Sequence, residues 1–118
     1  MSFRRLAAIG YVLIVAFPAF ADPSEFTSRT QPLVRKYCHR CHNADNRESG
    51  IRVDTLADSI DESQVKHWQH VRDQISDGWM PPEDEPQPSD AERSYLVDWL
   101  DRALQKAKER PREASIHR

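Results

Sequence analysis

The pentapeptide at residues 38–42, Cys-His-Arg-Cys-His, constrains this chain more than any other feature. Cys38 and Cys41 are the only cysteines among the 118 residues, and His42 directly follows the second. Two thiols about one helical turn apart can each form a thioether with one ring, which leaves the adjacent imidazole beneath that ring and directed at its metal. The spacing therefore predicts covalent attachment of one haem c through Cys38 and Cys41, with His42 as an axial iron ligand.

The Cys-x-x-Cys spacing alone also suits two other kinds of site. It occurs in redox-active disulfides and in half of many zinc sites. In this haem-free alternative, Cys38 and Cys41 form a disulfide, or bind a metal ion together with His42 and one further group. The neighbouring histidine favours haem over both of these sites.

The first 21 residues have the pattern of a secretory signal peptide. Two arginines precede the apolar run of residues 6–17, and Ala-Phe-Ala at residues 19–21 has the small-x-small pattern of a cleavage site. The apolar run is shorter than the roughly 20 residues of a spanning helix, and Pro18 follows it, so a retained membrane anchor is the less favoured alternative. We therefore expect a periplasmic or secreted protein whose mature chain begins at Asp22.

Charge and hydropathy limit the partners and the core of the mature chain. Two of the 17 Lys and Arg residues lie in the leader, which leaves 15 against 19 Asp and Glu, a formal charge of −4. A negative chain is a poor ligand for nucleic acid, so we expect no nucleic-acid partner and no membrane contact beyond the leader. The mean hydropathy of −0.78 indicates little apolar area to bury in so short a chain, and a haem would add to the core.

The remaining pattern predicts an all-α domain over residues 22–107 with three main helices. After an extended polar arm at residues 22–31, with Thr30 or Gln31 as cap, the first helix is expected over residues 32–41. The second is expected to start at Asp61 or Ser63 and to end near Asp77, before Gly78. Residues 108–118 are expected to form a charged, disordered tail.

The third helix is expected to begin at Ser89, because Glu92 three residues later completes a capping box. Polar and proline-rich loops are predicted between the helices, over residues 43–60 and 78–88. Gly50 is expected to have a positive φ or to approach the cofactor closely. One turn of helix in the first of these loops is expected to pack on the haem edge.

Two of the predicted helices carry an apolar face. The face of the second helix is expected to cover the haem and consists of Val65, Trp68, Val71 and Ile75. The face of the third helix is expected to pack across the first helix and consists of Leu96, Trp99 or Leu100, Ala103 or Leu104, and Ala107.

The iron needs a second axial ligand besides His42. Met80 is the only methionine after the leader, and it follows a helix end and precedes two prolines that stiffen its loop. A thioether is a suitable haem ligand, so Met80 is the favoured candidate. His67 and His70 on the preceding helix are its rivals, because bis-histidine ligation is common among haem proteins. We expect both histidines to be ordinary solvated side chains.

Together these motifs resemble the planctomycete-type cytochrome c domains, a short branch of the class I monohaem cytochromes. The resemblance covers most of residues 30–107 and implies thioether attachment through Cys38 and Cys41 and axial ligation by His42 and Met80. The segments that carry it are Tyr37 to His42, Gly50, Trp68 with Val71, Gly78 to Pro82, and Leu96 with Trp99 and Leu100.

The pattern and the resemblance lead us to expect a class I-like monohaem cytochrome c that carries single electrons outside the cytoplasm and is not an enzyme. The alternative is a haem subunit, or a peroxidase-like partner, of a larger exported oxidoreductase, although only His67 and His70 could act as distal acid or base. Redox protein partners are expected to dock near five basic residues around the Cys-x-x-Cys-His motif, although these residues could instead serve only solubility. The five residues are Arg35, Lys36, Arg40, Arg47 and Arg52.

Overall fold

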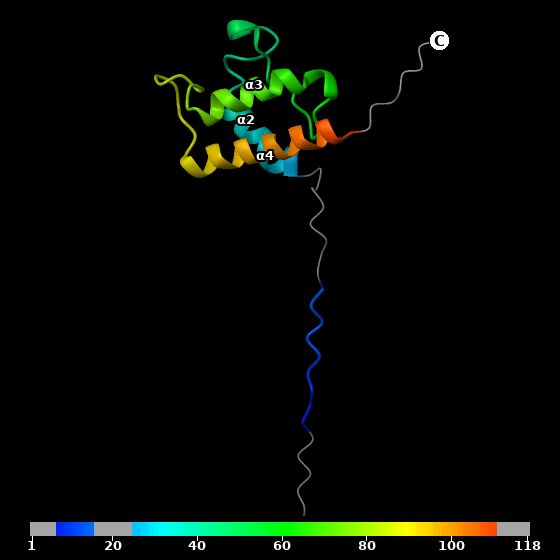
Figure 1. The fold of residues 1–118 in the computed structure, drawn as a ribbon. Coiled ribbons are helices and arrows are strands. Elements are labelled where there is room, and N and C mark those ends of the chain that lie inside the picture. The colour runs from blue at the N-terminus through cyan, green and yellow to red at the C-terminus, as the bar shows by residue number, and fades with distance from the viewer. Residues whose placement is uncertain (1–6, 16–24, 111–118) are drawn as a thin grey trace, which may run out of the picture.

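The computed structural model describes residues 7–15 and 25–110 (Figure 1). Within these ranges the chain is helical, and its only extended pairing is an isolated bridge between His42 and Arg47. The predicted all-α class is confirmed. The elements are η1 (Phe26–Thr30), α2 (Gln31–Tyr37), η2 (Glu48–Gly50), η3 (Glu62–Gln64), α3 (Val65–Ser76) and α4 (Asp90–Glu109).

Part of the predicted leader falls within the described residues. Residues 7–15 have no regular secondary structure, and their side chains are exposed. The predicted cleavage site at residues 19–21 and the end of the predicted tail, residues 111–118, lie outside the described ranges. None of the helices in those ranges has the length and hydropathy needed to cross a membrane.

The first helical segment begins and ends earlier than the sequence predicts. The π-helical turn η1 continues directly into α2, so the extended arm predicted over residues 22–31 is wrong for its described part. In a regular α-helix, the ring of Pro32 would meet the carbonyl group four residues before it. The wider hydrogen bonding of η1, in which the Gln31 N–H donates to the Phe26 carbonyl, directly precedes this proline. The helix then ends at Tyr37, so Cys38 and Cys41 lie beyond it.

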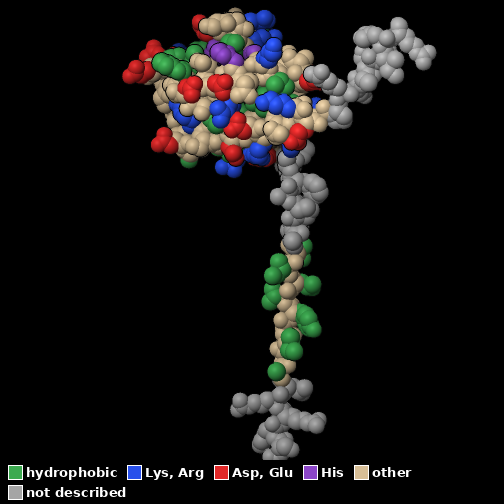
Figure 2. Space-filling model, viewed as in Figure 1, with side chains coloured by type: hydrophobic (Ala, Val, Ile, Leu, Met, Phe, Trp, Pro, Cys, Tyr) green, Lys and Arg blue, Asp and Glu red, His purple; other side chains and the backbone are tan. Residues whose placement is uncertain are grey.

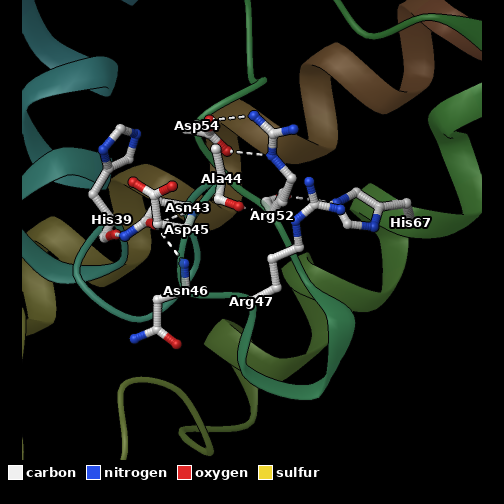
Figure 3. Close-up of polar contacts among 9 residues, drawn as sticks. All are labelled: His39, Asn43, Ala44, Asp45, Asn46, Arg47, Arg52, Asp54 and His67. Carbon is white, nitrogen blue, oxygen red and sulfur yellow. Dashed lines mark hydrogen bonds and ion pairs between the residues drawn. The ribbon is translucent and has the colours of Figure 1, made fainter.

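An irregular segment joins α2 to η3, as the sequence predicts for most of this stretch. The side-chain oxygen of Asn43 accepts hydrogen bonds from the N–H groups of Asp45 and Asn46 at 2.9 and 2.7 Å, which closes a tight turn (Figure 3). Further along, Gly50 ends η2 with a φ of +74°, so the predicted positive φ is confirmed. The neighbouring Ser49 also has a positive φ, of +54°.

Helix α3 ends near the predicted residue, but it begins at Val65, after the 3-10 turn η3 that starts at the predicted cap. The Asp61 carboxylate accepts a hydrogen bond from the Ser63 N–H at 2.9 Å and caps η3, which leads into α3. At the other end, the Gly78 N–H donates to the Ile75 carbonyl and the Trp79 N–H to the Gln74 carbonyl, at 3.2 and 3.0 Å. With a φ of +78° at Gly78, these two bonds form a Schellman motif, which is why the helix stops here.

Helix α4 begins at the predicted capping box. The Glu92 N–H donates to Ser89 Oγ at 3.1 Å, and the Ser89 N–H donates to the Glu92 carboxylate at 2.9 Å. The main packing partner of α4 is α3, which lies beside it (Figure 1). The buried residues of α4 are those of the predicted stripe: Leu96, Trp99, Leu100, Ala103, Leu104 and Ala107.

The first helical segment also reaches α4, through side chains that lie far apart in the sequence. The rings of Phe26 and Trp99 pack with centroids 5.6 Å apart. The hydroxyl groups of Thr30 and Tyr95 lie within 2.9 Å of each other. Thr30 is fully buried there and makes no capping bond with its side chain, so the prediction that it caps the first helix is wrong.

The loop before α3 contributes to the same core. Val53, Leu56 and Ile60 are buried, and the Leu56 N–H donates to the Val53 carbonyl at 3.2 Å. This single hydrogen-bonded turn lies in the loop for which the sequence predicts one turn of helix. From α3, the core receives Trp68, which is 4% exposed, and Ile75.

Candidate functional site

The Cys-x-x-Cys-His segment forms a compact turn at the end of α2. The N–H groups of Cys41 and His42 both donate to the Cys38 carbonyl, at 3.3 and 3.1 Å. Cys38 is the residue at which the helix ends, and its own N–H donates to the Val34 carbonyl at 2.9 Å. A turn therefore brings the two half-buried thiols together, where the sequence predicts a continuous helix.

The imidazole of His42 is oriented by the loop that follows it. Its Nδ1 atom lies 3.1 Å from the Ile51 carbonyl oxygen, and its own backbone carbonyl accepts a hydrogen bond from the Val53 N–H at 3.0 Å. A carbonyl can only accept, so this contact requires the proton on Nδ1 and leaves the lone pair on Nε2. Metal-binding histidines are commonly oriented in this way.

Two cavities adjoin at the motif. The first has a volume of about 680 Å³ and the second about 610 Å³, each including space that is open to solvent. Both are lined by Cys38, His42, Ile75 and Met80, and Cys41 lines the first. The structure thus brings together all four predicted site residues.

The chemistry of the lining also fits a haem. Apolar side chains from three parts of the chain complete the walls: Val53 from the loop, Val71 from α3 and Leu96 from α4. Two thiols for thioether bonds, one oriented imidazole and one thioether sulfur are the donors that a covalently bound haem with two axial ligands requires. The residues present therefore fit this cofactor.

Trp68 does not contribute to either cavity. The sequence predicts that it covers the haem, but its indole ring is buried in the core between the helices. Val71 and Ile75, which lie one and two turns further along α3, line the second cavity instead. The apolar face of α3 is wide enough to contribute to both the core and the cavity. Helical periodicity alone does not show which of its residues face the core and which face the cavity.

The rival histidines differ in position. His67 Nε2 lies 3.0 Å from the Arg52 carbonyl oxygen (Figure 3), its ring packs edge-on against Trp68 at 4.8 Å, and it lines neither cavity. His67 is thus a half-buried residue with a partner and not the solvated side chain that the sequence predicts. His70 is exposed, as predicted, but it lines the second cavity together with His42 and Met80.

The backbone of Met80 is fixed on both sides. Its N–H donates to the Gln74 carbonyl at 3.2 Å, and its carbonyl accepts a hydrogen bond from Arg93 Nη1 at 2.9 Å. The residue is therefore tied to α3 through one bond and to α4 through the other. Arg93 belongs to no recognisable sequence motif, and only its place one turn before the buried Leu96 on α4 could have indicated a role.

The Cys38 thiol is poorly suited to redox or metal chemistry by itself. Burial, with a smaller contribution from the charge of Cys41, raises the pKa of Cys38 to about 11. Redox-active and metal-binding cysteines are instead stabilised as thiolates. In addition, no group of three His, Cys, Asp or Glu side chains within residues 7–15 and 25–110 is arranged to hold a metal ion. The raised pKa of Cys38 thus does not favour the haem-free alternative.

The five basic residues around the motif have separate surroundings. Only Lys36 and Arg40 line the first cavity. Arg52 forms two hydrogen bonds to the Asp54 carboxylate, at 2.9 and 2.6 Å, which neutralise its charge locally (Figure 3). On the face seen in Figure 2, basic and acidic side chains are interspersed. Of the five residues, Lys36 and Arg40 are therefore the two whose charges lie at the first cavity.

A helical domain with this motif and this cavity has the features expected of a protein that attaches haem covalently. Comparison with known families is consistent with this expectation, since residues 38–84 match the family described as Planctomycete cytochrome C. The predicted resemblance is thereby confirmed for the segment from Cys38 through Met80, though not for the whole of residues 30–107. Members of the cytochrome c family use haem for electron transfer. No curated protein and no solved structure matches the chain.

Proposed function

We propose that this chain is an exported one-electron carrier that binds one haem c covalently, with His42 and Met80 as axial ligands. The match of residues 38–84 to a cytochrome c family supports haem-based electron transfer. The observation that carries the proposed ligand set is that Cys38, His42 and Met80 line both adjoining cavities. When bound, haem supplies a one-electron ferric–ferrous couple.

The residues of the chain would act on this couple by fixing its surroundings. The Ile51 carbonyl holds the imidazole of His42 in one tautomer and orientation. Val71, Ile75 and Leu96 give the cavity apolar walls, which would limit the rearrangement of water that a change of charge requires. A thioether from Met80 favours the reduced iron relative to a second imidazole, so we expect a potential on the higher side.

The cellular location is part of the proposal. Cytochrome c domains are typically exported, and the leader predicted at residues 1–21 would direct the chain across the membrane before haem is attached. We propose that the mature protein is periplasmic or secreted and that it starts at Asp22.

Electron exchange with a protein partner would take place at the mouth of the first cavity. Lys36 and Arg40 line this cavity, and Arg40 is 79% exposed even though it lies 3.4 Å from Glu85. An exposed ion pair of this kind is weak, so the Arg40 charge remains available to a partner. We propose that the partner presents acidic groups here.

One observation favours a second candidate function. Because His70 lines the same cavity as His42 and Met80, the iron could have a histidine, or an open position beside a histidine, on its distal side. That arrangement would suit a bis-histidine carrier or the peroxidase-like subunit.

An absorption spectrum of the full chain, produced together with haem-attachment machinery, tests the proposal. We expect a low-spin spectrum and haem that remains bound after denaturation. The double variant Cys38→Ala/Cys41→Ala should lose covalent haem and its cooperative thermal transition, because this polar chain needs the cofactor to complete its core. The matched variant His42→Ala should keep covalent haem but become high-spin, which separates attachment from ligation.

Two results would contradict the proposal. A colourless wild-type protein with a cooperative transition would indicate the haem-free module. A high-spin wild-type protein that binds peroxide would indicate the peroxidase-like subunit.

A further inference from the structure

The loop that carries Met80 has few backbone hydrogen bonds of its own. Residues 81–88 include four prolines, which donate none, and the backbone bond within them is that from the Glu85 N–H to the Pro82 carbonyl, at 2.9 Å. Carbonyl groups in such a loop need donors from elsewhere. Side chains must therefore hold this loop in place.

One guanidinium supplies the main link to the rest of the fold. Arg93 Nη1 donates to the carbonyl oxygens of Ile75 and Met80, at 2.8 and 2.9 Å, and Nη2 donates to Gln87 Oε1 at 2.9 Å. All three acceptors are neutral oxygens, so the charge strengthens hydrogen bonds and does not form an ion pair in these contacts. It also lies at the end of α3, where the helix dipole favours a cation.

Gln87 extends this link to the proline-rich part of the loop. With its oxygen held by Arg93, its Nε2 atom faces three carbonyl oxygens, those of Pro81, Pro82 and Glu85, at 3.0, 2.8 and 3.1 Å. Arg93 and Gln87 together thus reach the loop on both sides of its proline pair.

We propose that Arg93 is the positioning residue for Met80, which it holds at the cavity by fixing the Met80 carbonyl between α3 and α4. This inference rests on the proposed function, because its consequence is the strength of the bond between the Met80 sulfur and the iron. Without Arg93, the Met80 N–H would keep its bond to Gln74, while the carbonyl and the prolines behind it would lose their anchor. The sulfur would then leave the iron more often, although the haem would stay attached through Cys38 and Cys41.

The test compares Arg93→Gln and Arg93→Lys with the matched control Arg72→Gln in the holoprotein. Arg72 also joins α3 to α4, through bonds to Asp101 at 2.7 and 3.1 Å, but its contacts do not include the Met80 loop. Two quantities are measured in the ferric protein: the near-infrared absorption band that reports sulfur ligation, and the affinity for added imidazole, which competes with Met80.

We expect Arg93→Gln to weaken the sulfur band and to raise imidazole affinity by about tenfold or more, because charge-assisted hydrogen bonds are lost. Arg93→Lys, which keeps the charge but not the fork of donors, should fall between this variant and wild type. Arg72→Gln should leave both quantities unchanged. Hydrogen exchange should also quicken at the Trp79 and Met80 amides in Arg93→Gln only.

Equal effects of Arg72→Gln and Arg93→Gln would overturn the inference, since Arg93 would then be a general tie between helices. If Arg93→Gln changes neither the near-infrared sulfur band nor the imidazole affinity, the inference about Arg93 is wrong. The proposed function would not be affected by this result. If the wild-type protein itself lacks the sulfur band, the proposed ligation fails before any variant is compared, so the two failures are distinguishable.

Discussion

The Nδ1 atom of His42 lies 3.1 Å from the carbonyl oxygen of Ile51, and this contact links the Cys-x-x-Cys-His motif to the loop that follows it. The loop reaches this position through two successive residues with positive φ, Ser49 and Gly50. The backbone at these two residues therefore helps to decide where the ring of His42 points.

Gly50→Ala should destabilise the holoprotein by about 1 kcal/mol, because a residue with a Cβ atom is strained in the left-handed conformation. Ser49→Gly is the matched control. It should be neutral or slightly stabilising, since glycine adopts the positive φ of residue 49 without strain. Denaturant titration of both variants measures the difference. Equal destabilisation by the two substitutions would mean that φ is not the controlling factor.

Ser89→Ala should lower the free energy of unfolding by about 1 kcal/mol, because it removes the hydrogen bond that caps α4. Ser94→Ala changes an exposed serine inside the same helix and should be neutral or slightly stabilising. Thermal unfolding monitored by circular dichroism compares the two. A Ser89→Ala variant as stable as Ser94→Ala would show that the cap contributes nothing.

The carboxylate of Glu92 should make stability depend on acid pH. Hydrogen bonds from the Ser89 N–H, and next from the Tyr37 hydroxyl, hold the pKa of Glu92 below its usual 4.5. Since the folded-state pKa is the lower one, this contribution is complete above pH 4.5 and is lost as the pH falls through the folded value.

Melting temperatures between about pH 7 and about pH 3 should therefore fall less steeply for Glu92→Gln than for wild type. Glu83→Gln, in the exposed proline-rich loop, is the matched control and should keep the wild-type slope. An unchanged slope in Glu92→Gln would contradict this assignment.

Several parts of this structure are predictable because their signals are local. The capping box of Ser89 and Glu92, the stop at Gly78 and the positive φ at Gly50 each depend on neighbouring residues, and all three are confirmed. Likewise, the attachment motif and the Met80 loop each lie within a few residues of sequence.

Other parts depend on contacts between distant residues, which one sequence does not reveal. The segment around Phe26 is helical although its pattern is polar, and there Phe26 meets Trp99 and Thr30 meets Tyr95 across the fold. The role of Arg93 is not predictable for the same reason, since its acceptors lie 6 to 18 residues away.

Charge reversal at the cavity mouth should slow electron exchange with an acidic partner. We expect Lys36→Glu and Arg40→Glu to reduce the second-order rate several-fold at low ionic strength and to weaken its salt dependence. Arg47→Glu changes a basic residue that lines neither cavity and should have a smaller effect. Stopped-flow kinetics measures these rates, and equal effects at all three positions would point to net charge instead of a docking site.

The reduction potential of Met80→Ala, compared with that of His70→Ala, tests the central claim most directly. Axial ligands help to set haem potentials that span roughly 0.8 V, so loss of the thioether should lower the potential by roughly 0.1 V or more. Haem should remain attached, and small ligands should begin to bind the iron, while His70→Ala keeps the wild-type potential and spectrum. If Met80→Ala leaves both unchanged and His70→Ala alters them, the iron is bound by two histidines and the proposed ligation is wrong.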